Sequence, residues 1–251
     1  MPVDVLRTID VSCPHRPATG RPDAALCANC AIRHSALFKT LDPASLDRMR
    51  PHVQTVQLPV DGAVFQRGVK GSAVYTLRSG LVRFERLDER GLSRIVRLAG
   101  PGELLGQESL LDRAYVDDAR ACTPVELCRI PSGLVQTLAS EPGGMPRELM
   151  ARWQDALDAA QTWTAELTCG PARARVLKLL AHLGHLAGPD GKVWLPRLHD
   201  IGNMLDLTLE TASRQISALR KEGVLRRHPL RSASIDAVAL QAALRKLNDA
   251  A

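Results

Sequence analysis

The stretch Leu198–Gly223, LHDIGNMLDLTLETASRQISALRKEG, is typical of two short helices joined by a tight turn. Ile201 and Leu205 give the first helix an apolar face, and Thr208 follows the break where its hydroxyl can cap the second helix. The second helix has an apolar stripe at spacings of three, four and three residues, which we expect to be buried: Leu209, Ala212, Ile216 and Leu219. The stretch therefore predicts a helix-turn-helix motif.

The opposite face of the second helix is polar and is predicted to point outward. In a major groove a carboxylate can accept a hydrogen bond from cytosine, a guanidinium can donate two to guanine, and hydroxyls can reach other base edges. A solvated helix face has the same composition, so the spacing leaves DNA contact and simple exposure both open. The candidate DNA-binding residues are Thr208, Glu210, Ser213, Arg214, Ser217, Arg220 and Lys221, of which the last two would contact phosphates.

The segment IGNMLDLTLETASR resembles the recognition element of the CRP/FNR family of bacterial transcription regulators. Its Glu-x-x-Ser-Arg run resembles the FNR branch in particular. By this resemblance Glu210, Ser213 and Arg214 carry base readout, and the expected target is a palindrome of TTGA-like half-sites. The resemblance also implies a homodimer, with RNA polymerase as a further partner.

The chain has 251 residues, enough for one large domain or two smaller ones with cores of their own. A net charge of +6 favours a polyanionic partner, and an aromatic content of 3% argues against a stacking platform for single-stranded nucleic acid. No apolar run reaches the roughly 18 residues of a membrane span and no leader is evident, so we expect a cytoplasmic protein. The six cysteines are then expected to be thiols, metal ligands or redox sensors rather than disulfides.

The first 36 residues hold Cys13 and the pair Cys27-Ala28-Asn29-Cys30. A C-x-x-C loop lets two thiolates reach one metal or cluster, although a redox couple has the same spacing. The run CANCAIRH resembles the N-terminal cysteine segment of FNR-type oxygen sensors, which implies a [4Fe–4S] cluster that is lost when oxygen attacks it. The third cysteine usual in that segment is missing, since the places where it would fall hold Ser35, Ala36, Leu37 and Phe38.

Two further cysteines complete the expected ligand set. Cys13 can replace the missing residue, because the loop between it and Cys27 can fold back at little entropic cost. The segment ELCRIPSGLV resembles the FNR segment that carries the effector-domain ligand, which points to Cys128 and not to Cys122. The expected ligands are therefore Cys13, Cys27, Cys30 and Cys128. The alternatives are haem or nitric-oxide sensing, thiol oxidation, and zinc bound with a histidine such as His15 or His34.

Residues 41–138 hold short apolar segments separated by glycine turns, such as Asp61-Gly62 and Ser79-Gly80. This pattern predicts an antiparallel double-sheet roll, although a sandwich without a ligand has the same pattern. The segment resembles the cyclic-nucleotide-binding β-roll over essentially its whole length. An enzyme is disfavoured, because metal-dependent catalysis in a roll needs two or three histidines and His52 is the only one in these residues.

The resemblance to the nucleotide-binding roll also bears on its ligand. Members that bind a nucleotide present an Arg-Ser pair to the cyclic phosphate and a glutamate to the ribose, whereas this chain holds Asp117, Asp118 and Gln107 at those places. A carboxylate facing a phosphodiester repels it by about 1 to 4 kcal/mol per close charge pair. We therefore expect that cyclic AMP is not the effector. The nearby Glu103 and Arg120 are expected to take part in the loop's own ion pairing and not to form a replacement anion site.

Residues 145–167 are predicted to form one long helix with an apolar seam at alternating spacings of four and three residues. The expected dimer seam is Leu149, Trp153, Ala156, Ala160, Trp163 and Leu167. An amphipathic helix packed on its own roll would have the same spacing. A dimer agrees better with a palindromic target, because two-fold symmetry places two recognition helices about 34 Å apart.

Together these segments predict an α+β protein with four parts. They are an N-terminal cysteine-containing arm (1–36), a β-roll sensor domain (37–141), a dimerisation helix (142–169) and a winged helix-turn-helix domain (170–251). The wing is expected at 223–229 and 232–235, and its candidate phosphate contacts are Arg226, Arg227, His228 and Arg231.

Overall fold

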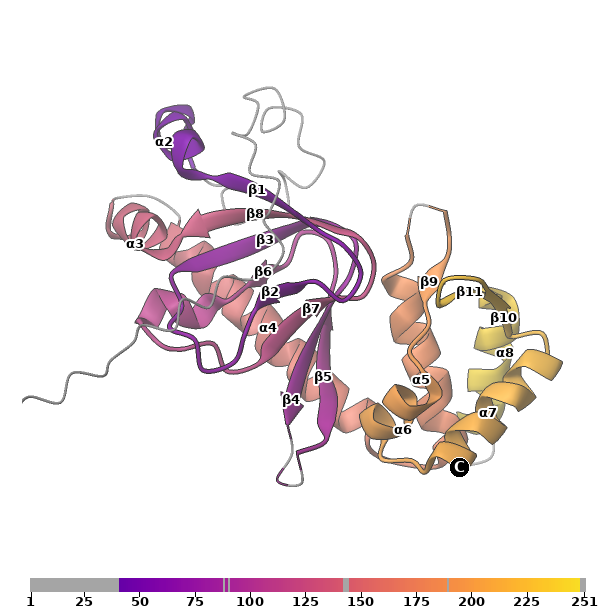
Figure 1. The fold of residues 1–251 in the computed structure, drawn as a ribbon. Coiled ribbons are helices and arrows are strands. Elements are labelled where there is room, and N and C mark those ends of the chain that lie inside the picture. The colour runs from indigo at the N-terminus through magenta and orange to yellow at the C-terminus, as the bar shows by residue number, and fades with distance from the viewer. Residues whose placement is uncertain (1–40, 88, 90, 142–144, 189, 249–251) are drawn as a thin grey trace, which may run out of the picture.

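The computed structural model describes residues 41–248, apart from 88, 90, 142–144 and 189. A β-roll is followed by one long helix and then by a C-terminal domain of helices and short strands (Figure 1). The α+β class and the order of these parts agree with the sequence prediction. No helix among the described residues is long and apolar enough to cross a membrane.

The roll consists of two four-stranded antiparallel sheets, as the glycine turns predicted. The first has the order β1 (Gln54–Leu58), β8 (Val125–Pro131), β3 (Ala73–Ser79), β6 (Leu104–Leu105). The second has the order β2 (Ala63–Phe65), β7 (Asp118–Ala121), β4 (Val82–Leu87), β5 (Ser93–Ala99). Leu77 and Leu127 are fully buried between the sheets, where the rings of Phe65 and Tyr115 stack with centroids 4.1 Å apart.

Short helices cover the outer face of the first sheet (Figure 1). They are α2 (Pro43–Met49), η1 (Arg50–His52), η2 (Gln107–Leu111) and α3 (Ser132–Ser140). Met49, Val135 and Leu138 from this layer pack on Val74 and Ile130 of the sheet. The roll therefore has a second apolar cluster outside its two sheets, which we call the outer cluster.

The long helix α4 (Met145–Leu167) runs from the roll to the C-terminal domain (Figure 1). That domain contains α5 (Ala172–His185), β9 (Val193–Trp194), α6 (Leu198–Leu205), α7 (Leu209–Lys221), β10 (Leu225–His228), β11 (Ser232–Ile235) and α8 (Ala237–Asn248). The predicted wing is β10 and β11, and the structure adds β9 as a third strand, because Trp194 pairs with Ser232.

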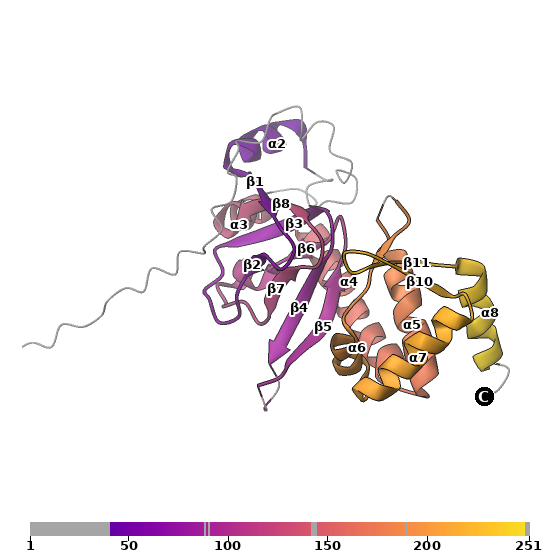
Figure 2. The same ribbon diagram turned by 45° about the vertical axis from the view of Figure 1, so that its right-hand side comes forward.

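The C-terminal domain packs directly on the roll, with α6 beside β5 (Figures 1 and 2). Leu81, Ile95, Leu98 and Cys122 of the roll belong to the same apolar cluster as the buried residues of α5, α6 and α7. The two parts therefore share a core in this arrangement.

Candidate DNA-binding interface and effector sites

The turn between α6 and α7 has the tight geometry that a helix-turn-helix needs. Asp206 closes α6 in the left-handed region with φ of 50°, which short polar side chains tolerate. The amide of Leu207 donates to the carbonyl of Gly202 at 2.9 Å, and a Cβ at Gly202 would lie only 2.9 Å from the Leu207 carbonyl oxygen. The Thr208 hydroxyl accepts from the amide of Thr211 at 3.2 Å, which confirms the predicted cap.

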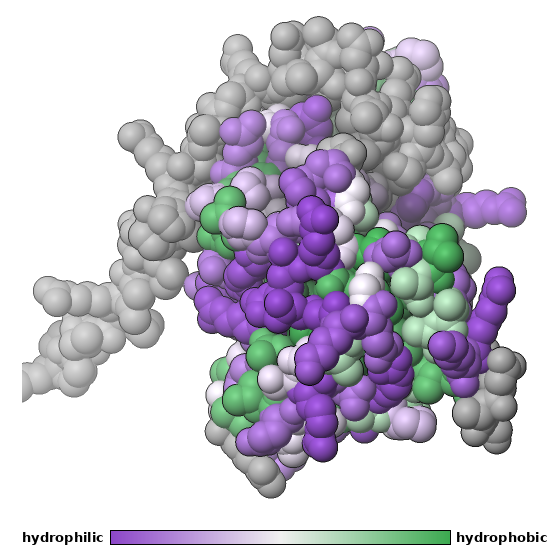
Figure 3. All heavy atoms as spheres, turned by 90° about the vertical axis from the view of Figure 1, so that its right-hand side faces the viewer, coloured by the Kyte–Doolittle hydropathy of each residue, from purple (hydrophilic) through white to green (hydrophobic). Residues whose placement is uncertain are grey.

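The outward face of α7 presents most of the predicted recognition residues. Glu210, Arg214 and Ser217 are exposed and Ser213 is half-buried. The backbone amide of Glu210 and the Thr208 hydroxyl hold the pKa of the Glu210 carboxyl below its ordinary value, so this side chain is an ionised hydrogen-bond acceptor at neutral pH. Hydrophilic residues cover much of the C-terminal domain's face in Figure 3.

One prediction for α7 was wrong. Leu209 was expected in the buried stripe with Ala212, Ile216 and Leu219, but its side chain is 51% exposed. Leu209 is the first residue of the helix, so it lies before the turns of α7 that pack on α5 and α6. The other three residues are buried as predicted.

The basic residues around α7 divide into two groups. Arg220, Lys221, Arg226 and Arg227 are exposed and suit phosphate contacts. Arg231 was predicted to contact phosphate but folds back into its own domain. Its guanidinium lies 5.0 Å from the centroid of the Trp194 ring and 3.3 Å from Asp200, so it holds the wing on β9 and α6.

The α4 seam residues lie in different surroundings. Trp163 and Leu167 are buried in this chain's own C-terminal core, where the Trp163 ring meets His182 edge-on at 5.6 Å. Leu149 is half-buried against the outer cluster and Ala156 is half-buried, whereas Ala160 is exposed and Trp153 is 37% exposed. Two exposed apolar neighbours of Trp153, namely Met150 and Leu157, were not in the predicted seam. Their spacing of three and four residues from Trp153 was the available signal.

The cysteines of the roll face different regions. Cys128 lies on β8 and packs, half-buried, in the outer cluster together with Leu41, the first residue that the structure describes. Cys122 is 3% exposed in the core shared with the C-terminal domain, and burial raises its pKa to about 12. Cys13, Cys27 and Cys30 lie outside the described residues. Among residues 41–248 that are described, no group of three or more histidine, cysteine and acidic side chains is placed to hold a metal ion.

A cavity of about 280 Å³ lies between the roll and α4. Its lining includes Phe84, Arg97, Gln107, Arg113, Asp117 and Trp153. Of the two carboxylates predicted here, Asp117 and Asp118, only Asp117 lines the cavity, and it accepts from Arg86 at 2.7 Å. Asp118 instead accepts from the amide of Arg67 at 3.1 Å.

Glu103 and Arg120 each form an ion pair, as predicted, but their partners lie on strands β5 and β4 and not in the loop. Glu103 lies 2.7 Å from Arg97, and Arg120 lies 3.6 Å from Glu85.

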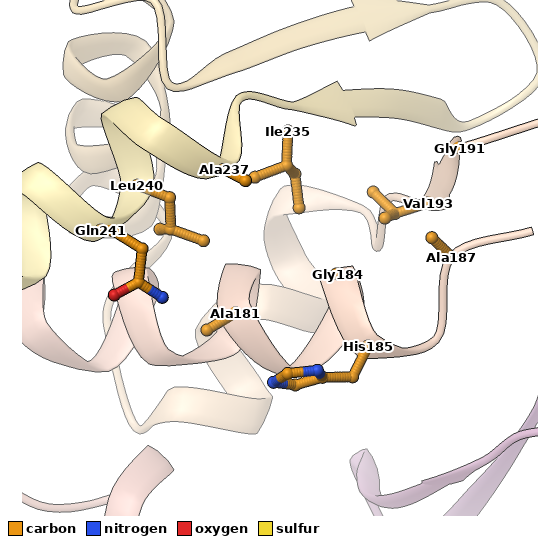
Figure 4. A pocket seen from close by; sticks show the side chains of 10 residues that line it. All are labelled: Ala181, Gly184, His185, Ala187, Gly191, Val193, Ile235, Ala237, Leu240 and Gln241. Atoms are coloured by element: carbon orange, nitrogen blue, oxygen red, sulfur yellow. The ribbon is translucent and has the colours of Figure 1, made fainter.

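Another pocket, of about 260 Å³, lies between α5 and the start of α8 (Figure 4). Its lining residues include none of the candidate DNA-binding side chains.

Comparisons with known proteins agree with this architecture. A family model described as "Cyclic nucleotide-binding domain" matches residues 55–141, and one described as "Crp-like helix-turn-helix domain" matches residues 174–243. The "Cyclic AMP receptor protein" of Thermus thermophilus is 31% identical over 199 residues, which cover 79% of this chain and 91% of that protein. The chain belongs to the CRP/FNR family of transcription regulators.

Other members of the CRP/FNR family are more distant. The "Anaerobic regulatory protein" of Aggregatibacter actinomycetemcomitans is 24% identical over 206 residues, or 79% of this chain and 80% of that protein. The solved structure of FixK2 from Bradyrhizobium japonicum has a TM-score of 0.66 at 24% identity, covering 76% of this chain and 96% of that one, and so shares the fold. Membership of the CRP/FNR family means that the helix-turn-helix binds DNA, and that the chain is a regulator and not an enzyme.

Proposed function

We propose that this chain is a homodimeric regulator that binds a palindrome of TTGA-type half-sites and senses oxygen or redox state through an iron–sulfur cluster. The outward face of α7 carries the DNA-binding part of this proposal. Glu210, Ser213 and Arg214 read bases there, while Thr208, Ser217, Arg220 and Lys221 bind the backbone and neighbouring positions. RNA polymerase is the proposed protein partner.

Replacing Arg214 with alanine tests the base-reading role. We expect Arg214→Ala to weaken binding to the palindrome by about 1 to 3 kcal/mol, or about 5- to 150-fold, and to change binding to random duplex little. Lys221→Ala should weaken both by a similar factor, because a phosphate contact is independent of sequence. Fluorescence anisotropy with the two duplexes separates these outcomes. Equal losses for Arg214→Ala on both would mean that Arg214 contacts only phosphate.

The proposed dimer forms along α4. From the sequence we proposed the seam Leu149, Trp153, Ala156, Ala160, Trp163 and Leu167. Burial of Trp163 and Leu167 inside one chain leaves little of them for a partner, so the face that we now propose centres on the exposed Met150, Trp153 and Leu157, with Ala160. Apolar side chains exposed at this helical spacing favour packing against a second helix.

The proposed cluster ligands are Cys13, Cys27, Cys30 and Cys128. Cys128 fits this role better than Cys122, because it packs on the same outer cluster as Leu41, the first described residue, whereas Cys122 is buried in another core. The anaerobic role named for the Aggregatibacter relative also supports the proposal. A cluster on these thiolates would tie the arm to the roll and would be lost in oxygen.

A regulator without a cluster is the second candidate. The absence of a cysteine at Ser35, Ala36, Leu37 and Phe38 favours it, because the usual FNR spacing of ligands is broken. In that case α7 would still bind DNA and α4 would still form the dimer, but the regulator would respond to nitric oxide or haem, thiol oxidation, zinc or another small effector. Analysis of purified protein for iron, acid-labile sulfide and zinc distinguishes these inputs.

Cyclic AMP is not the proposed effector, although the Thermus relative is named for it. Asp117 lines the cavity between the roll and α4, and Arg97 there is already paired with Glu103 and lies over the Phe84 ring. We expect isothermal titration calorimetry to detect no binding of cyclic AMP at about 1 mM, a concentration at which even a weak site of about −4 kcal/mol would be half filled. Stoichiometric binding at micromolar concentration would refute this expectation.

A further inference from the structure

The turn of the helix-turn-helix is tied to the roll by two polar contacts. Nη2 of Arg94 lies 2.7 Å from Oδ1 of Asp206, and Nδ2 of Asn203 donates to the carbonyl oxygen of Ser93 at 3.3 Å. Arg94 and Ser93 begin β5, whereas Asn203 and Asp206 belong to the end of α6 and its turn. We call these two contacts the β5–turn contact.

The same turn is also held by α5. Nη1 of Arg175 donates to the carbonyl oxygens of Leu205 and Asp206. Because the turn is bonded to α5 of its own domain and to β5 of the roll, a rotation of the domain away from the roll must break the β5–turn contact. Behind it, Ile95 of β5 and Ile201 of α6 belong to one buried cluster.

The recognition face remains open while the turn is held. Glu210, Arg214 and Ser217 are exposed on α7. The covalent link from α4 to α5 is short and includes Gly170, whose φ of 90° only glycine adopts readily. Such a link sets the orientation of the domain weakly, so noncovalent contacts fix it, namely the apolar core that the domain shares with the end of α4 and with the roll, and the β5–turn contact.

We propose that Arg94 and Asp206 are positioning residues for DNA binding. By joining the turn to β5, the pair sets the angle of α7 relative to the roll and α4, and thereby the distance between the two recognition helices of a dimer. The β5–turn contact then selects the spacing between half-sites without touching DNA. This inference rests on the proposed dimeric function.

Three duplexes and three variants test the proposal. The duplexes are the full palindrome, the palindrome with one base pair added to its spacer, and a single half-site. The variants are Arg94→Gln, Asp206→Asn and the double variant, and asparagine is chosen because it also tolerates the left-handed conformation. Binding is measured by fluorescence anisotropy at one fixed salt concentration.

We expect each single variant to bind the palindrome about fivefold more weakly, because each of the two chains loses one exposed ion pair. The double variant should bind the palindrome no more weakly than either single variant, because each single substitution already removes the same contact. Preference for the correct spacer should fall by a similar factor, and binding to the half-site should not change. Arg94→Lys, which keeps the charge, should retain most of the wild-type affinity for the palindrome.

The matched control is Glu141→Gln. It removes another surface ion pair, Arg48–Glu141 at 2.6 Å, which lies within the roll, and it should change binding to none of the duplexes. Wild-type affinity of Arg94→Gln and Asp206→Asn for the palindrome would overturn the positioning role. If these variants lost as much affinity for the single half-site as for the palindrome, the positioning role would also be overturned, because Asp206 would then act inside its own domain. A wild-type protein that binds half-site and palindrome equally would instead overturn the dimeric function and this inference with it.

Discussion

Cys128→Ser is expected to abolish the difference in DNA binding between protein kept under nitrogen and protein exposed to air. The reason is that Cys128 is the proposed ligand on the roll, so its loss disconnects the N-terminal arm from the outer cluster. Serine is close in size to cysteine and Cys128 is only half-buried, so the fold should survive. Anisotropy with the palindrome before and after air exposure measures the response, and iron analysis measures the loss of the cluster.

Cys169→Ser is the matched control for this experiment. Cys169 is exposed after the end of α4 and is not among the proposed ligands. Its variant should keep the iron content and oxygen response of the wild type. A Cys128→Ser protein that still responds to oxygen like the wild type would rule out the ligand assignment.

Leu157→Asp is expected to convert the dimer to a monomer at micromolar concentration and to weaken binding to the palindrome by at least about 100-fold. Leu157 is 51% exposed between the turns of α4 that carry Trp153 and Ala160, and a carboxylate there would be buried without a partner in a helix pair. An uncompensated buried charge costs about 3 to 5 kcal/mol. Sedimentation velocity measures the change in mass, and anisotropy measures the change in affinity.

Leu87→Asp is the control for Leu157→Asp. Leu87 is equally exposed, at 51%, but it lies at the end of β4, away from the proposed seam. It should leave mass and affinity unchanged. If Leu157→Asp remained a dimer with full affinity, the face of α4 that carries Met150, Trp153 and Leu157 would not be the dimer interface.

The helix-turn-helix and the roll could be predicted because their signals are local. Thr208 caps α7 through an amide three residues away, and the glycine turns of the roll fix where each strand ends. The face of α4 was harder to predict, because Trp153 and Trp163 have the same apolar character and both fit one helical stripe. Packing of α5 on the end of α4 buries Trp163, whereas Trp153 stays partly exposed.

Charge pairs between residues far apart in the chain could not be predicted from the sequence either. Asp117 is paired with Arg86, 31 residues away, and Arg231 is paired with Asp200 at the same separation. Spacing along the chain says nothing about such pairs, because strand register and domain packing decide them. Asp117 and Asp118, predicted at one site, therefore have different partners, and Arg231, predicted to contact phosphate, is paired inside its own domain.

The most direct test of the central claim is an anaerobic purification followed by a visible spectrum, iron and acid-labile sulfide analysis, and palindrome binding before and after exposure to air. We predict a brown protein with about four irons and about four sulfides per chain, which loses its colour and its palindrome affinity together in air. A colourless protein without iron, with the same palindrome affinity under nitrogen and in air, would contradict the oxygen-sensing account and leave a CRP/FNR regulator with a different input.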